Sequence, residues 1–282
     1  MSGVLYIVAT PIGNLDDISR RAIQVLESVT AIAAEDTRHS KRMLDHFGIR
    51  TRVFSCHEHN ERTRVKEVLK RLEAGEDIAL ISDAGTPLIS DPGYQLVRAA
   101  REAGAVVVPV PGASSIVAAL SAAGLPTDRF YYCGFLPNKP AECLSALRAL
   151  RQIPGTLIML ESRHRIVRLV TQLAEVFPRH ICAIAKELTK LHERFMTGSA
   201  NELLLWLRSD EQLQKGEFVV MIDNGDRHRE DDSNEVTDAL LHDLLKHVSV
   251  KVAVDIASRA TGDRKNSLYT RALQYQDEME SG

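Results

Sequence analysis

The sequence predicts an α/β protein made of two α/β halves and a small helical tail. Short apolar runs alternate with amphipathic helical patterns through the first 120 residues, and the alternation starts again after Phe130. With 282 residues, 44% hydrophobic and 26% charged, the chain is long enough to bury sizeable cores. This composition excludes intrinsic disorder and fibrous repeats.

The first half is expected to contain a parallel sheet with helices on both faces, because its apolar runs are continuous rather than alternating. The expected strands cover residues 3–9, 29–34, 52–55, 78–82 and 105–110. The expected helices cover residues 18–27, 41–47, 61–72, 94–103 and 114–123. Ligands of such sheets bind at the carboxyl ends of the strands.

The second half repeats the pattern and ends in a polar segment. Its expected strands are 156–160, 181–185 and 217–222, and its expected helices are 141–150, 166–177 and 201–207. Two prolines in 135–140 suggest a linker between the halves. Residues 225–234 are rich in charged side chains and suggest a second boundary, which precedes an amphipathic helix expected over 236–248. The predicted domains are 1–125, 126–228 and 235–282.

Charge, cysteine content and hydropathy narrow the class of protein. A formal net charge of −3 excludes a uniformly basic protein that coats nucleic acid, but it leaves room for a local basic patch. Four widely spaced cysteines without a CxxC pair are typical of free thiols in a reducing compartment. No apolar run approaches the roughly 20 residues that span a bilayer. We therefore expect a cytoplasmic protein without a membrane partner.

Several familiar catalytic motifs are absent from the sequence. It contains no GxGxxG after the first strand, no GxxxxGK[ST], no HExxH and no GxSxG. The His57-Glu58-His59 run resembles a metal site, but alternate histidines rarely reach one ion without a third ligand. A loop that faces solvent or substrate is the better interpretation, and no metal is predicted.

Three loops at successive strand ends combine Gly and Pro with Ser, Thr or Asp. They cover residues 10–14, 82–93 and 109–115. Glycine lets the backbone approach a ligand closely, while the polar side chains supply hydrogen bonds. Each loop alone could be a tight strand-to-helix turn. Three at one sheet edge indicate a single small-molecule pocket.

These loops, together with segments 134–137 and 186–193, resemble the tetrapyrrole methylase superfamily in order over residues 3–225. The resemblance implies an S-adenosylmethionine-dependent methyltransferase with two α/β domains and the cofactor in the cleft between them. Segments 35–38, 57–61 and 186–190 are similar to the ribosomal RNA small subunit methyltransferase I branch. That branch methylates a ribose 2′-oxygen of a cytidine in the decoding region of 16S rRNA. One departure is Arg163, where proline is expected.

The resemblance also implies which residues contact the cofactor. Those expected at the methionine end and the middle of the pocket are Pro11, Gly13, Ser82, Asp83, Ala84, Thr86, Pro87 and Leu88. Those expected to bind polar groups or to close over the adenosine are Ser114, Ser115, Leu160, Lys186 and Ile222. Asp83 has alternative roles, since it could cap the helix near Pro92 or brace its own loop.

The segment from Arg38 to Arg71 is strongly basic within an acidic chain. It holds ten Lys or Arg against four Asp or Glu, and four histidines besides. A solvated helix face is the usual explanation of such a run, but this one follows strands at the predicted pocket edge. The residues expected to contact RNA here are Arg38, His39, Lys41, Arg42, His57, His59, Arg62 and Arg64. A tetrapyrrole with many carboxylates would also suit this charge.

The tail has two short helical patterns around Gly262. Small residues at Ala253 and Ala257 permit close helix packing, as in a helix-turn-helix. Residues 251–271 hold five basic residues against two acidic ones, so we expect Arg264 and Lys265 to contact RNA. A nucleic-acid-binding tail favours the RNA branch over a tetrapyrrole enzyme.

Methylation of a ribose hydroxyl requires an oriented oxygen and help in removing its proton. Lys186 with Glu187 is the leading candidate pair, and Glu35 with Arg38 belongs to a second cluster on the facing loops. Alternatively, Glu187 and Arg38 form an interdomain salt bridge that only sets the cleft.

The predicted function is therefore an S-adenosylmethionine-dependent rRNA 2′-O-methyltransferase. Its expected substrate is small-subunit rRNA within an assembled or assembling ribosomal subunit, and the resemblance implies a homodimer. The alternatives are a tetrapyrrole C- or O-methylase and a non-catalytic ribosome-binding factor that uses the cofactor as a ligand.

Overall fold

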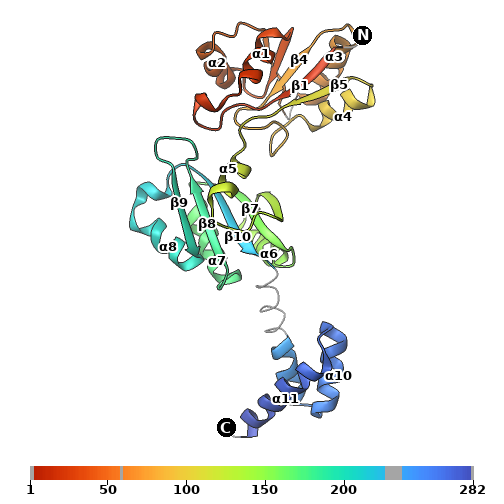
Figure 1. Ribbon diagram of the computed structural model, residues 1–282, viewed down its shortest axis with the longest axis vertical. Coiled ribbons are helices and arrows are strands. Elements are labelled where there is room, and N and C mark those ends of the chain that lie inside the picture. Colours follow the sequence, from red (N-terminus) through yellow and green to blue (C-terminus); the bar gives the residue numbers. More distant parts are fainter. Residues whose placement is uncertain (1–2, 58–59, 226–236, 281–282) are drawn as a thin grey trace.

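The chain forms two α/β units and then a group of C-terminal helices, which follow one another along the sequence (Figure 1). The computed structural model describes residues 3–57, 60–225 and 237–280, without the side chains of 62 and 277–280. The predicted fold class is confirmed.

The first unit contains a parallel sheet with strand order β3-β2-β4-β1-β5. Its strands are β1 (Val4–Val8), β2 (Ala31–Ala34), β3 (Val53–Ser55), β4 (Ile78–Ile81) and β5 (Val106–Val110). Every residue of β2 and β4 is buried, as the continuous apolar runs predict for strands covered on both faces. All the strands are parallel, so their carboxyl ends meet at one edge.

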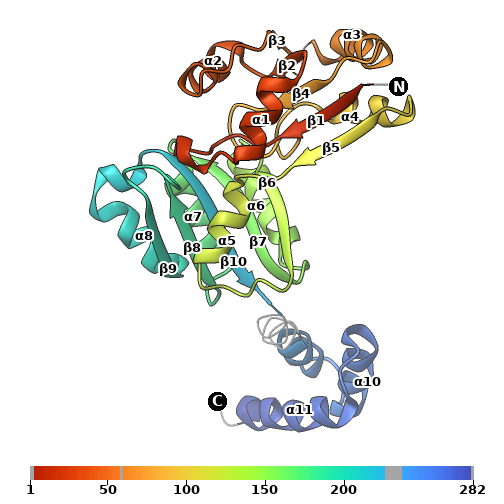
Figure 2. The same ribbon diagram turned by 45° about the horizontal axis from the view of Figure 1, so that its top comes forward.

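Helices cover both faces of this sheet (Figure 2). They are α1 (Arg20–Ser28), α2 (Thr37–His46), α3 (Glu61–Glu73) and α4 (Tyr94–Glu102), with a short 3₁₀ turn η1 (Leu15–Asp17). Helices α1 and α2 pack on one face through residues such as Leu26 and Leu44, whereas α3 and α4 pack on the other through Leu72 and Leu96. Asp36 starts α2, because its carboxylate accepts the backbone N–H groups of the first turn.

The second unit contains a mixed sheet with strand order β6-β7-β10-β8-β9. Its strands are β6 (Phe130–Phe135), β7 (Gly155–Ser162), β8 (Ile181–Lys186), β9 (Arg194–Ser199) and β10 (Glu217–Asn224). Its helices are α5 (Ser115–Ala122), α6 (Pro140–Leu150), α7 (Ile166–Val176) and α8 (Ala200–Ser209), with a 3₁₀ turn η2 (Glu211–Gln214). Helices α6, α7 and α8 cover one face, and α5 covers the other.

The connection between the units differs from the expected one. The predicted linker at 135–140 joins β6 to α6 within the second unit, because β6 pairs with β7. Helix α5 packs its apolar side chains on the second sheet, with Leu120 in the same core as Val219. The predicted domain boundary at residue 125 therefore lies after a helix that packs with the second unit. Strands β6 and β9 were missing from the sequence prediction.

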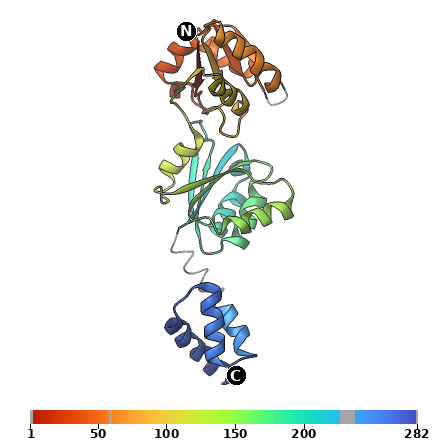
Figure 3. The ribbon, with the colours of Figure 1, turned by 90° about the vertical axis from the view of Figure 1, so that its right-hand side faces the viewer.

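The C-terminal helices enclose a small apolar core of their own (Figure 3). Residues 237–245 are helical, followed by α10 (Val250–Thr261) and α11 (Lys265–Glu280). Gly262 ends α10 with a φ of 79°, which glycine adopts without strain, and Ala253 and Ala257 are fully buried. The predicted boundary at 225–234 lies almost wholly outside the described residues. No helix in the described ranges is long and apolar enough to cross a bilayer.

Candidate active site

Two adjoining cavities lie between the strand ends of the first sheet and one end of the second. The larger has a volume of about 490 Å³ and the smaller about 240 Å³. Ile12, Asp83, Ala84 and Glu217 line both cavities, so these residues mark their junction. The position agrees with the pocket expected at the carboxyl ends of the parallel strands.

Several of the predicted cofactor residues line these cavities. They are Pro11, Gly13, Ser82, Asp83, Ala84, Ser115 and Leu160. Ser115 and Leu160 lie on the larger cavity, and Pro11, Gly13 and Ser82 on the smaller. The structure thus brings residues more than 140 positions apart in the sequence to one place.

Hydrogen bonds fix the three predicted loops against each other. Thr10 and Gly85 form an isolated antiparallel bridge, with N···O distances of 2.8 and 3.0 Å. The Thr86 hydroxyl donates to the carbonyl of Ala113 at 3.1 Å, which ties the second loop to the third. Thr86, Pro87, Leu88 and Ser114 do not line either cavity; Thr86 braces the loops instead. Their predicted cofactor contacts stay predictions.

The loop after β8 closes the site from the second unit. The Glu187 carboxylate accepts hydrogen bonds from the Glu217 backbone N–H at 2.9 Å and from Lys190 Nζ at 3.0 Å. Burial would raise the pKa of Glu187, but these bonds and the Lys190 charge outweigh it, and the pKa is lowered. A carboxylate held in its ionised form by such bonds is a weak base, and the catalytic role expected of Glu187 stays a prediction.

Lys190 is a site residue that the sequence reasoning missed. It lines the smaller cavity and its ammonium also pairs with Glu217 at 2.9 Å. The alternative of an Arg38–Glu187 salt bridge is not formed among the described residues, where Glu187 pairs with Lys190. Lys190 lies in the 186–190 segment, but its approach to the cavity depends on the contact of this loop with the loop after β1.

Lys186 and Ile222 line neither cavity. Strand pairing places Lys186 opposite Phe218, and the core on that sheet face holds both Phe218 and Ile222. The neighbours Ala185 and Val219, on the other face, line the larger cavity, as does Phe218. The cofactor contacts expected of Lys186 and Ile222 stay predictions.

Backbone strain is concentrated around the site. In the part of the chain that the structure describes, the non-glycine residues with positive φ are Leu88, Ser90, Glu187 and Thr189. All four belong to the second predicted loop or to the loop after β8. Non-glycine residues keep such unfavourable backbone conformations only where many surrounding contacts hold them, and this occurs at many functional sites.

Carboxylates gather on the first-unit side of the larger cavity. Glu35, Asp83 and Asp91 line it, and Asp83 also accepts the Asp36 backbone N–H at 3.1 Å, which ties the loop after β4 to that after β2. Burial is the main cause that raises the pKa of Glu35, and the charges of Asp91 and Asp83 raise it further. Burial also raises the pKa of Asp91, against a hydrogen bond with Ser82. Asp91 was not singled out from the sequence.

Helix α2 presents basic side chains beside the smaller cavity. His39, Ser40 and Met43 line that cavity, whereas Lys41 and Arg42 are exposed on the same helix. Arg38 is also exposed and lines neither cavity. The predicted basic surface thus begins at the rim of the site.

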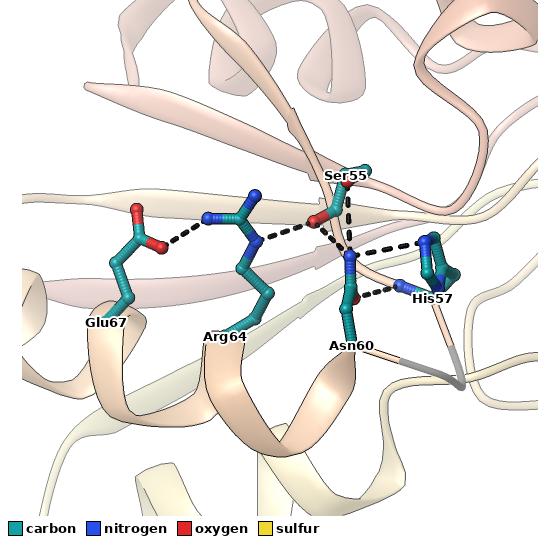
Figure 4. A network of polar contacts seen from close by, with 5 residues as sticks. All are labelled: Ser55, His57, Asn60, Arg64 and Glu67. Carbon is teal, nitrogen blue, oxygen red and sulfur yellow. Dashed lines mark hydrogen bonds and ion pairs between the residues drawn. The ribbon is translucent and has the colours of Figure 1, made fainter.

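Arg64 and His57 take part in an internal network at the start of α3 (Figure 4). The Asn60 amide joins His57 to Ser55, and Arg64 Nε donates to the Ser55 carbonyl at 3.1 Å. Arg64 also pairs with Glu67 and lies 5.6 Å from the Phe54 ring centroid. Its guanidinium therefore stabilises this part of the fold, and its expected contact with RNA stays a prediction.

The other predicted RNA-binding residues have mixed surroundings. His59 and the side chain of Arg62 lie outside the described residues. In the tail, Lys265 pairs with Asp255, whereas Arg264 is exposed. Within the described ranges, no group of three or more His, Cys, Asp or Glu side chains is placed to hold a metal ion.

Two known protein families match this chain. Tetrapyrrole (Corrin/Porphyrin) Methylases match residues 4–204, and the RsmI C-terminal HTH domain matches residues 230–276. The chain belongs to the tetrapyrrole methylase family. Ribosomal RNA small subunit methyltransferase I of Pseudomonas aeruginosa is 50% identical over 98% of each chain. The protein of the same name from Escherichia coli O157:H7 is 47% identical over 97% of this chain and 96% of its own. This methylase therefore belongs to the methyltransferase I branch.

Solved structures agree on the fold. Uroporphyrin-III C-methyltransferase from Thermus thermophilus, complexed with S-adenosyl homocysteine, matches with a TM-score of 0.53. It is 18% identical and covers 80% of this chain and 99% of its own. The two α/β units of this methylase thus share the fold of that structure.

The close contact at Gly13 gives a test of how the site is closed in this methylase. A Cβ at Gly13 would lie 2.6 Å from Lys190 Cγ, 2.7 Å from Thr189 Oγ1 and 2.9 Å from the Leu188 carbonyl oxygen. We expect Gly13→Ala to lower the free energy of unfolding by about 1–3 kcal/mol and to weaken S-adenosylmethionine binding in calorimetric titration.

The matched control is Gly48→Ala, at a residue with a φ of 71° and open space around it. It is expected to cost about 1–2 kcal/mol of stability through backbone strain alone and to leave cofactor affinity unchanged. Equal cofactor affinities for both variants would contradict the assignment of Gly13 to the closure of the site.

Proposed function

We propose that this methylase uses S-adenosylmethionine to methylate small-subunit rRNA, at the ribose 2′-oxygen of a cytidine in the decoding region. The observation that carries the RNA assignment is the exposed basic surface of α2 at the rim of a cavity whose carboxylates suit a cationic methyl donor. The tail that matches the RsmI C-terminal HTH domain supports the same substrate class.

The larger cavity fits the cofactor chemically. Apolar side chains of Leu160, Leu188 and Val219 supply a surface for a purine, while Glu35 and Asp91 offer negative charge to a sulfonium and an ammonium. Bound S-adenosylmethionine supplies an activated methyl group. The protein binds and orients the acceptor oxygen, excludes water and receives the proton.

The polynucleotide would approach over helix α2. Lys41 and Arg42 are exposed, and they lie next to His39 and Ser40, which line the smaller cavity. Cationic side chains placed in this way position a phosphate backbone without reading its sequence. A ribose held by flanking phosphates would then lie near the junction of the two cavities.

Glu35 is the proposed acceptor of the hydroxyl proton. Its carboxylate is half-buried in the larger cavity, and burial together with the charges of Asp91 and Asp83 raises its pKa. A carboxylate with a raised pKa is a stronger base than an ordinary one. Glu187 is unsuited to this role, since its hydrogen bonds favour the ionised form.

A homodimer is the proposed assembly. Strand β6 lies at the edge of the second sheet, and Phe130, Tyr131 and Phe135 on it are exposed. Large apolar side chains at a sheet edge suit contact with a second copy. An rRNA substrate places the proposed activity in the cytoplasm, on assembled or assembling subunits.

The direct test is methyl transfer from labelled S-adenosylmethionine to small ribosomal subunits that lack the modification. We expect label in one ribose of the rRNA, located by nuclease mapping. Label on a tetrapyrrole precursor with none on RNA would favour the alternative methylase. Binding to subunits without transfer would favour a non-catalytic factor.

Replacing Glu35 tests the proton acceptor. Glu35→Gln is expected to lower kcat by about 10²–10⁴, the usual contribution of a general base, with little change in cofactor affinity. Asp91→Asn removes a charge that raises the pKa of Glu35. It should therefore move the acidic limb of the pH–kcat profile to lower pH.

Stability provides an independent readout for Glu35. Because its folded pKa is raised, ionisation opposes folding once the pH exceeds the ordinary value, and the penalty is complete above the raised value. Glu35→Gln should therefore unfold at a higher temperature than wild type at pH 7, and at the same temperature below pH about 4. An unchanged midpoint at pH 7 would contradict the raised pKa.

The basic surface of α2 is tested by salt dependence. A Lys41→Ala, Arg42→Ala double variant should bind subunits more weakly and reduce the slope of log affinity against log salt by about 2. Arg101→Ala is the control, because Arg101 is exposed on α4, which packs on the opposite face of the first sheet. A slope unchanged in the double variant would exclude phosphate contact by α2.

A further inference from the structure

The smaller cavity adjoins the larger one, and it is lined by the expected cofactor residues Pro11, Gly13 and Ser82 together with residues that have no expected role in cofactor binding. It is lined by the loop after β1, by α2 and by Lys190, whereas the apolar surface suited to a purine lies in the larger cavity. The two compartments meet at Ile12, Asp83, Ala84 and Glu217. A methyl donor in one and an acceptor in the other would face each other at that junction.

Ser40 gives the smaller cavity an unused polar group. The residue is 3% exposed, and its hydroxyl oxygen is buried with no hydrogen-bond partner among the described residues. A buried hydroxyl without a partner lowers stability and is rare in folded proteins. Ser82, by contrast, uses its hydroxyl within its own loop. Ser40 therefore has an unpartnered hydroxyl in a residue that lines the cavity.

The remaining walls suit a flat, partly apolar group. Ile12, Leu15 and Met43 contribute apolar surface, and His39 is exposed where α2 borders the cavity. Unstacked RNA bases are typically bound by apolar or aromatic contact on their faces and by hydrogen bonds at their edges. The basic residues Lys41 and Arg42 on the same helix would hold the neighbouring phosphates.

We infer that the smaller cavity receives the unstacked pyrimidine base of the target nucleotide, with the Ser40 hydroxyl hydrogen-bonded to the edge of the base. The ribose then lies at the junction beside Asp83, with its 2′-oxygen towards the larger cavity. This inference rests on the proposed rRNA methyltransferase function. It assigns base selection to α2 rather than to the tail.

Two substitutions at Ser40 separate a binding role from a structural one. Ser40→Ala removes the hydroxyl and should lower kcat/KM for subunits about tenfold, with a melting temperature equal to or above that of wild type. Ser40→Val also fills space and should lower kcat/KM about a hundredfold. Cofactor affinity, measured by calorimetry, should stay within twofold for both variants.

Ser115→Ala is the matched control, because Ser115 lines only the larger cavity. It should weaken cofactor binding without changing KM for subunits. The inference is overturned if both Ser40 variants methylate subunits with kcat/KM within twofold of wild type. It is also overturned if Ser40→Ala lowers the melting temperature, since a structural hydroxyl would then explain the loss.

A binding measurement tests the cavity even if methyl transfer to RNA fails. A cytidine-containing oligoribonucleotide is titrated into the full-length protein with S-adenosyl homocysteine present. Binding that Ser40→Val weakens at least tenfold, and that a purine in place of the cytidine also weakens, supports a pyrimidine pocket. Equal binding by wild type and Ser40→Val overturns it. The proposed function is judged separately, by transfer of label.

Discussion

The contact between the loop after β1 and the loop after β8 is the constraint on which the rest of the site depends. Gly13 lies against Thr189 and Lys190 with no room for a Cβ, and the Asn14 backbone N–H donates to the Thr189 hydroxyl at 3.0 Å. Both cavities are bounded by residues from both units, so their shapes follow from how closely these loops approach. The left-handed conformations of Glu187 and Thr189 and the carboxylate of Glu187 are used in building this contact.

The surroundings shift the pKa values of two carboxylates of the site, Glu187 and Glu35, in opposite directions. Glu187 is surrounded by donors, which lower its pKa and favour the folded loop in the ionised state. Glu35 is half-buried and lies near other carboxylates. Both burial and the neighbouring charges raise its pKa, and its ionisation therefore lowers the stability of the folded protein. A protein retains an unfavourable charge where chemistry uses it. Ser40 is an uncharged group in a similar position. Its hydroxyl is buried without a hydrogen-bond partner, which lowers the stability of the fold, and the inferred contact with the base would use this hydroxyl.

Much of the fold could be predicted because its signals are local. Continuous apolar runs identified the strands of the first sheet, and Gly262 marked the turn between the tail helices. Strand β9 was missed because it is an edge strand without an apolar run. The strands that hold Lys186 and Ile222 were predicted, but which residues of these strands line the cavities depends on the packing of the sheet against α5 and the loops. Asp91 and Lys190 depend on contacts between distant loops, for which one sequence holds no signal.

The passage of the chain from β5 to α5 has a mechanical consequence. Helix α5 belongs to the core of the second unit, so residues 111–114 carry the backbone from one unit to the other. The carbonyl of Ala113 in this segment accepts a hydrogen bond from the Thr86 hydroxyl. Ser115, the first residue of α5, lines the larger cavity. A rotation of one unit against the other would turn about this segment, beside the wall of the larger cavity. Such a rotation would change the shape of the cavity and the distance between its two walls at the same time.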